Sequence, residues 1–151
     1  MMKTLFEPSV VQEVKSRLQT LRRDSPRQWG SMSAPQVVAH CARSMEMAVG
    51  DLNPPRVFIG RIFGPVVKPL ALGNDRPMKR NSPTAPALRI TGEPDLDVER
   101  DRLNALIDRF HAGGPSRCTT HPHAFFGRMN PEEWAELMYK HLDHHLLQFG
   151  A

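Results

Sequence analysis

Two histidines near the C-terminus are four residues apart in a segment with the pattern of an amphipathic helix. Because each helical residue turns by about 100°, His141 and His145 share one face, one turn apart, at the spacing that two imidazoles need to hold one metal ion. The rest of that face is mostly apolar and carries Trp134, Leu137, Met138, Gln148 and Phe149. The pattern therefore directs both histidines toward the interior, where a buried imidazole needs a partner.

A third imidazole is offered by His40, on a helix predicted from Ser33 to about Gly50. The apolar face of that helix is centred near Cys41, and His40 lies at its margin, about 100° from the centre. Three imidazoles from two helices would leave one coordination position open, as catalytic zinc sites do. The alternative is that these are core histidines, hydrogen-bonded to a carbonyl or a carboxylate. Cys41 itself is interpreted as a buried, unreactive thiol.

Five of the seven histidines fall within 25 residues, which favours a functional site there. Gln148 and Trp134 share the face of His141, so they could line a pocket or simply belong to the core. His144 projects about 60° off that face and could support a ligand, act as an alternative ligand, or lie exposed. His121 and His123 could lie at the rim of the site or be ordinary loop histidines.

The pair of histidines does not match the helix signature of zinc proteases. Leu142 stands where that signature has its catalytic glutamate, and Asp143 projects to the opposite face. A protease is therefore excluded, and the catalytic residues themselves stay unknown.

Composition indicates one ordinary domain over residues 1–151. The chain is 40% hydrophobic and 24% charged, with a formal net charge of +4. Its 20 Lys and Arg residues are scattered, so we expect no nucleic-acid partner. Two cysteines are too few for a disulfide framework, and the first eight residues lack the pattern of a signal peptide. Cytoplasmic residence is the resulting expectation.

Apolar periodicity predicts four long helices, at residues 9–23, 33–50, 96–111 and 131–149. Ser33 with Gln36, and Asn130 with Glu133, have the spacing of helix-capping pairs, and Gly113-Gly114 would stop the third helix. Four helices without strand alternation predict an all-α four-helix bundle.

A long crossover through residues 51–94 would join the second and third helices, and it holds eight of the 14 prolines. Its apolar run, residues 57–70, predicts a broken helix or two short turns, because Gly64-Pro65 and Pro69 interrupt it. The favoured interpretation is a flap over the core, with an oligomer contact or a membrane-surface contact as alternatives. The run is too short and too charged to span a bilayer, and we expect no membrane partner. Residues 74–88 are predicted to form a solvated loop.

The chain resembles the DinB/YfiT-like superfamily of metalloenzymes, and more closely a bacterial subfamily of uncharacterised function within it. The resemblance is carried by His121-Pro122-His123 through Phe125-Phe126-Gly127, and by Glu133-Trp134. It continues in Lys140-His141-Leu142-Asp143-His144-His145 and in Gln148-Phe149-Gly150, and a second stretch runs from Trp29 to Cys41. It covers both ends of the predicted bundle and leaves the proline-rich middle unmatched.

The resemblance implies a four-helix bundle, often a homodimer, in which His40, His141 and His145 bind a divalent metal such as nickel or zinc. Some superfamily members are thiol-dependent S-transferases or isomerases that use a low-molecular-weight thiol such as bacillithiol, mycothiol or glutathione. A metal held by three imidazoles can bind a thiol as thiolate or can ionise water for hydrolysis. The expected function is thus a metal-dependent transferase or hydrolase acting on a small molecule. The alternative is a non-catalytic helical bundle that binds a small molecule or a metal.

Overall fold

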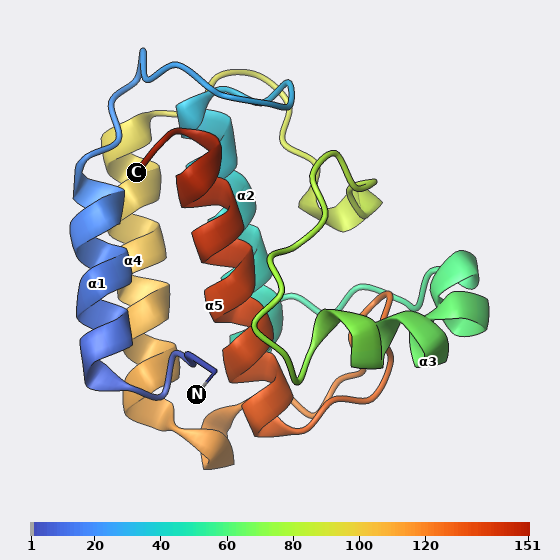
Figure 1. The fold of residues 1–151 in the computed structure, drawn as a ribbon. Coiled ribbons are helices and arrows are strands. Elements are labelled where there is room, and N and C mark those ends of the chain that lie inside the picture. Colours follow the sequence, from blue (N-terminus) through green and yellow to red (C-terminus); the bar gives the residue numbers. More distant parts are fainter. Residues whose placement is uncertain (1) are drawn as a thin grey trace.

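The computed structural model describes residues 2–151 and is entirely helical. It contains five α-helices and two short 3-10 helices (Figure 1). The α-helices are α1 (Pro8–Gln19), α2 (Ala34–Val49), α3 (Phe58–Ala71), α4 (Leu96–Gly113) and α5 (Pro131–Gln148), and the 3-10 helices are η1 (Pro86–Leu88) and η2 (Pro115–Arg117). Within residues 2–151 no strand forms, and the one ladder contact is an isolated bridge between His123 and Gly127. The all-helical prediction is confirmed.

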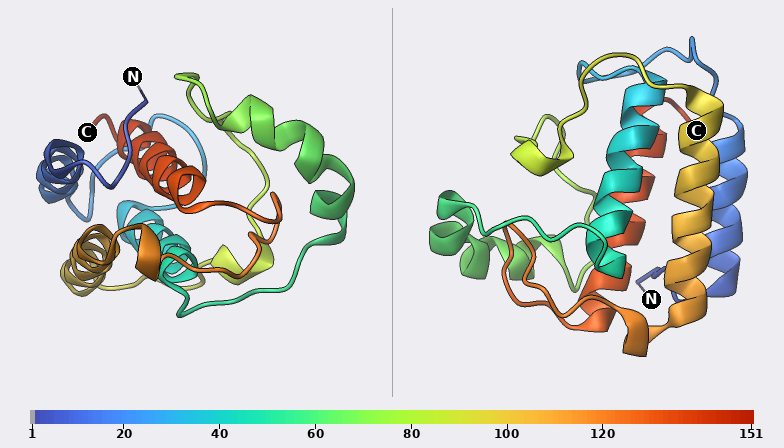
Figure 2. Two further views of the ribbon diagram at one scale, coloured as in Figure 1. Left: turned by 90° about the horizontal axis from the view of Figure 1, so that it is seen from below. Right: turned by 180° about the vertical axis from the view of Figure 1, so that it is seen from behind.

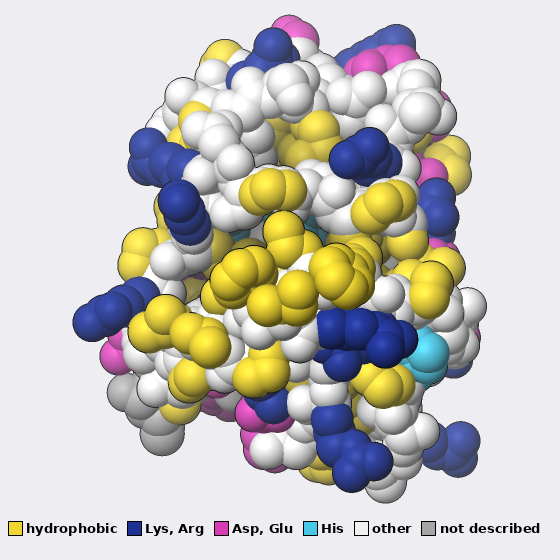
Figure 3. Space-filling view, turned by 90° about the vertical axis from the view of Figure 1, so that its right-hand side faces the viewer, with side chains coloured by type: hydrophobic (Ala, Val, Ile, Leu, Met, Phe, Trp, Pro, Cys, Tyr) yellow, Lys and Arg dark blue, Asp and Glu magenta, His cyan; other side chains and the backbone are white. Residues whose placement is uncertain are grey.

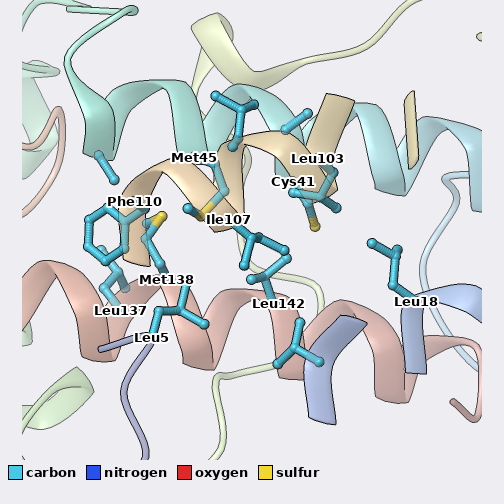
Figure 4. Packing of buried hydrophobic residues seen from close by; sticks show 14 of the residues in the cluster. Leu5, Leu18, Cys41, Met45, Leu103, Ile107, Phe110, Leu137, Met138 and Leu142 are labelled. Carbon is cyan, nitrogen blue, oxygen red and sulfur yellow. The ribbon is translucent and has the colours of Figure 1, made fainter. Parts of the chain in front are cut away.

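Four of the helices pack side by side. α2 contacts α4 and α5, and α1 contacts the same two helices from the other side (Figures 1 and 2). Their facing side chains form the apolar core, in which Met45, Leu103 and Ile107 are almost completely buried (Figure 4). The arrangement brings α2 and α5, the two helices that carry the candidate histidines, into direct contact.

The predicted starts of α2 and α5 are confirmed in detail. The Ser33 hydroxyl accepts from the backbone N–H of Gln36, whose side chain accepts in return from the backbone N–H of Ser33. Asn130 and Glu133 form the same reciprocal pair, with Pro131 in the first position. These caps fix where each helix begins. The predicted end of α5 is one residue too late.

The predicted end of α1 is wrong by four residues, because the helix stops at Gln19 and not at Arg23. Arg100 of α4 supplies a physical reason. Its guanidinium donates to the backbone carbonyls of Leu18 and Leu21, which satisfies carbonyl groups at the end of the helix. Leu21 stays buried although it has left the helix.

The prediction for residues 57–70 is also wrong, because α3 is one continuous helix that contains Pro65 and Pro69. Both prolines are exposed, so the carbonyl groups that lose an intrahelical partner can be hydrated. The helix is nevertheless not a flap that buries its apolar side chains on the core. It lies to the side of α2 and α5, away from α1 and α4 (Figure 2), and most of its large apolar side chains are exposed.

The segment after α3 is only partly the solvated loop predicted for residues 74–88. Leu88, in η1, is buried and packs with the core. Just before the loop, Lys140 of α5 donates to the carbonyl of Ala71 at 2.8 Å, and Glu136 accepts from the backbone N–H of Gly73 at 2.8 Å. The two hydrogen bonds fasten the start of the loop to α5, and the burial of Leu88 fastens its end to the core.

Across the described chain, no helix has both the length and the apolar content needed to cross a lipid bilayer.

Candidate metal centre

The structure brings His40 of α2 together with His141 and His145 of α5. One ring nitrogen from each lies within 4.8 Å of the others, and the Nε2 atoms of His40 and His141 are 2.9 Å apart. The three ring centroids are 4.7 to 4.8 Å from one another. His40 and His145 are buried, and His141 is partly exposed. The convergence that the helical spacing predicted is therefore present.

The orientation of His40 is fixed by a backbone carbonyl. Its Nδ1 lies 2.9 Å from the carbonyl oxygen of Leu88, which can only accept, so Nδ1 carries the proton. In the neutral ring this leaves a lone pair on Nε2, the atom that faces His141. The segment around η1 thus selects the tautomer of His40 that can bind a metal.

His145 is oriented in the same way by Gln148. The amide nitrogen of Gln148 donates to the carbonyl of Trp29 at 2.8 Å, which identifies the other end of the amide as the oxygen. That oxygen lies 2.9 Å from Nδ1 of His145, so Nδ1 donates and Nε2 keeps its lone pair. Partners of this kind typically hold the histidines of metal sites. Gln148, for which the sequence left a pocket-lining or a core position open, is buried and lies against a candidate ligand.

All three imidazoles are held in the neutral form. Burial is the main cause that lowers the pKa of His40 and, to about 3, that of His145. The pKa of His141 is lowered well below its ordinary value, first by burial and then by the neighbouring His145 and His40. Neutral imidazole is the form that binds a metal, so the cluster needs no deprotonation near neutral pH.

The donor set fits a divalent metal. Around a tetrahedral ion with bonds of about 2.1 Å, ligand nitrogens stand roughly 3.4 Å apart. The Nε2 atoms of His40 and His141 are 2.9 Å apart, and one ring nitrogen from each of the three histidines lies within 4.8 Å of the others, so small shifts would reach that value. Without an ion, the neutral rings of His40 and His141 share a hydrogen bond in which Nε2 of His141 donates. Metal binding would therefore require His141 to move its proton to Nδ1.

His144 lies beside the cluster and is half-buried. Its ring is 5.0 Å from that of His145 and 5.6 Å from that of Trp29. The guanidinium of Arg80 lies 4.0 Å from the indole ring of Trp29. Burial and then the charge of Arg80 lower the pKa of His144. His144 thus belongs to a wall of the site and not to the converging trio.

The remaining candidates lie in or against the loop before α5. Nε2 of His121 bonds to the carbonyl of Pro54 at 2.9 Å, which ties two loops together. Nδ1 of His123 accepts from the backbone N–H groups of Phe125 and Phe126, each at 3.1 Å, and its ring packs 5.4 Å from Trp134. Both histidines organise the loop, and Trp134 is a fully buried core residue.

Asp143 and Cys41, which the sequence analysis rejected as ligands, lie away from the three histidines' donor atoms. Asp143 forms an ion pair with Arg17 of α1 at 2.7 Å, on the opposite face of α5. Cys41 is buried in the core, and burial raises the pKa of its thiol.

A hollow in the surface leads to histidine side chains. Figure 3 shows it above the exposed apolar side chains that gather on the side where α3 lies, with histidine visible at its bottom. This is consistent with the partial exposure of His141.

Sequence reasoning missed the groups that orient the ligands. The carbonyl of Leu88 comes from a proline-rich segment without periodicity, and the carbonyl of Trp29 comes from a loop. Backbone groups have no residue-type signal, so no pattern could have identified them. Only the structure shows that this segment returns to the core, where Leu88 is buried.

Comparison with known proteins gives one match. A search of the curated proteins and a search of the solved structures found none. The model of the family described as "Protein of unknown function (DUF1569)" matches residues 6–151, nearly the whole chain. The chain therefore belongs to the DUF1569 family.

Proposed function

We propose that this protein is a metal-dependent enzyme of the DinB/YfiT type, in which His40, His141 and His145 hold one divalent metal ion. The observation that carries the proposal is the pair of tautomer-fixing contacts, from Leu88 to His40 and from Gln148 to His145. Each contact directs a proton to Nδ1 and leaves the lone pair on Nε2, the form in which that nitrogen can bind a metal. In both rings the nitrogen that keeps its lone pair belongs to the converging trio.

The chain's own residues would bind and orient. His40, His141 and His145 supply three neutral nitrogen donors, which leaves coordination for a small molecule. When bound, a divalent ion lowers the pKa of a coordinated thiol or water and so supplies a nucleophile near neutral pH. Trp29 and His144 form one wall beside the donors. The reaction that best suits this arrangement is the transfer of a low-molecular-weight thiol to a small electrophile, with hydrolysis as the other outcome.

Imidazole donors suit zinc and nickel, and these are the metals we propose. The same proposal has four further parts, which rest on the resemblance. They are the thiol, the homodimer, cytoplasmic residence, and a four-helix bundle of DinB/YfiT type formed by α1, α2, α4 and α5.

A test loads untagged protein with zinc or nickel and assays a panel of thiol-conjugation and hydrolysis reactions. His40→Ala should lose both the bound metal and turnover. His111→Ala is the matched control, because His111 lies on α4 and bonds to the carbonyl of Leu5, away from the trio. Turnover that persists in His40→Ala would contradict the proposal.

A second candidate is a non-catalytic helical protein that binds a small molecule or a metal. It is favoured by the direct hydrogen bond between His40 and His141, because that bond pairs the Nε2 atoms of the two rings without an ion. This candidate predicts that the metal-loaded protein catalyses none of the reactions in the panel.

A further inference from the structure

Helix α3 exposes a continuous apolar face. The side chains of Phe58, Ile59, Ile62, Phe63, Val66 and Leu70 are all more than half exposed, from 51% to 78%. They fall on one side of the helix, at the spacing of successive turns. An exposed apolar patch made by one element usually marks an interaction site.

The opposite side of α3 is fixed to the protein. A Cβ atom at Gly60 would lie 2.6 Å from the carbonyl oxygen of Phe125, and one at Gly64 would lie 2.5 Å from the same atom. Arg56 also donates to the carbonyls of Gly60 and Phe125. This close backbone contact holds the helix in one rotation, so the apolar face cannot turn inward.

The same stretch of chain concentrates positive charge. Residues 56–80 contain six Lys and Arg residues and one Asp, a net charge of +5, while the whole chain carries +4. Arg61, Arg76, Lys79 and Arg80 are exposed. Over residues 2–151, none of these four forms an ion pair. Figure 3 shows Lys and Arg side chains directly beside the gathered apolar side chains.

We propose that α3 binds the surface of an anionic lipid bilayer, lying in its plane with Phe58, Phe63 and the other exposed apolar side chains among the lipids. An in-plane helix needs an apolar face and a basic margin, and α3 with the following loop supplies both. α3 also stands out from the packed helices, where a flat surface can reach it (Figures 1 and 2).

Charge decides between a bilayer and a second copy of the chain. In a two-fold contact through α3, the +5 segment would face the same segment of the other copy, and the charges would repel. An anionic bilayer attracts them instead. The sequence left a membrane-surface contact open as an alternative to a buried flap, and the exposed apolar side chains of α3 favour that alternative.

Vesicle co-sedimentation of the full-length protein tests the proposal, with phosphatidylcholine vesicles and with vesicles in which about a third of the lipid is phosphatidylglycerol. The protein should bind the anionic vesicles, bind the neutral ones far more weakly, and dissociate as salt is raised. Equal sedimentation with both kinds of vesicle, or with neither, would overturn the proposal.

Variants locate the contact. Phe58→Ser combined with Phe63→Ser should weaken binding about tenfold or more, and Lys79→Gln about fivefold. The apolar control is Val98→Ser, since Val98 is 63% exposed on α4. The charge control is Arg22→Gln, at an exposed position after α1. Both controls should bind like the wild type.

Light scattering measures the oligomeric state and so tests the alternative, a dimer formed through α3. If the wild type is a dimer that the double Phe→Ser variant converts to a monomer, while neither binds anionic vesicles, then a second copy covers α3 and the proposal is wrong. Helical circular dichroism of each variant confirms that the substitutions at exposed positions leave the fold intact.

Discussion

The side-chain oxygen of Gln148 accepts a hydrogen bond of 2.9 Å from Nδ1 of His145, three residues earlier on α5. The amide cannot reverse without losing its bond to the carbonyl of Trp29. This one contact therefore determines which nitrogen of His145 offers a lone pair. It links the loop before α2 to the candidate metal centre.

Replacing Gln148 should weaken metal binding without abolishing it. In Gln148→Leu, His145 keeps its place on the helix but loses the acceptor that fixes its tautomer, so metal affinity should fall by about 10- to 100-fold. Competition titration with a chelating dye measures this. Asp143→Asn is the control, because Asp143 lies on the same helix and pairs with Arg17 on its other face. Equal metal affinity in Gln148→Leu and Asp143→Asn would show that Gln148 does not position His145 for metal binding.

His123 should make the protein sensitive to acid. Burial, and then the charge of Arg56, lower its pKa from the ordinary 6.5 to about 4. Between these values the unfolded chain binds a proton that the folded chain does not, so stability falls as pH falls. For one such group the loss between pH 7 and pH 5 is about 2 kcal/mol.

The variant His123→Asn isolates this effect. An asparagine oxygen can replace Nδ1 as the acceptor for the N–H groups of Phe125 and Phe126, but it does not titrate. Urea unfolding at both pH values should show a shallower pH dependence in the variant, even though its stability at pH 7 is lower through lost ring packing. An unchanged pH dependence would show that His123 is not responsible.

Gly60 should hold α3 in place. In Gly60→Ala the new methyl group would meet the backbone of Phe125 at 2.6 to 2.7 Å, and backbone cannot move aside as a side chain can. We expect α3 to detach locally, so limited proteolysis within residues 56–73 should accelerate. Ile62→Ala, on the exposed side of the same helix, is the control and should be cut at the wild-type rate. Protection equal to the wild type in Gly60→Ala would contradict the close contact.

The parts of the fold that depend on neighbouring residues could be predicted from the sequence. Ser33 with Gln36, and Asn130 with Glu133, act over three residues, so their spacing alone located the starts of α2 and α5. Helical spacing places His141 and His145 on one face of α5 and His40 at the margin of the apolar face of α2. The packing of α2 against α5 then brings the three together.

Features that depend on distant residues could not be predicted. α1 ends early where Arg100, about 80 positions away in the chain, binds its last carbonyls. α3 continues through two prolines because both lie on its exposed side. The carbonyls of Leu88 and Trp29 orient the candidate ligands through contacts that depend on the whole fold. None of these contacts has a signal in residue type or spacing.

The metal content of untagged protein, measured by elemental analysis after growth in zinc- and nickel-supplemented medium, tests the central claim most directly. The account predicts one divalent ion per chain in the wild type and in His111→Ala, and none in His141→Ala. A wild type that carries no ion and takes up none in titration would contradict it, as would a His141→Ala protein that binds metal as well as the wild type does.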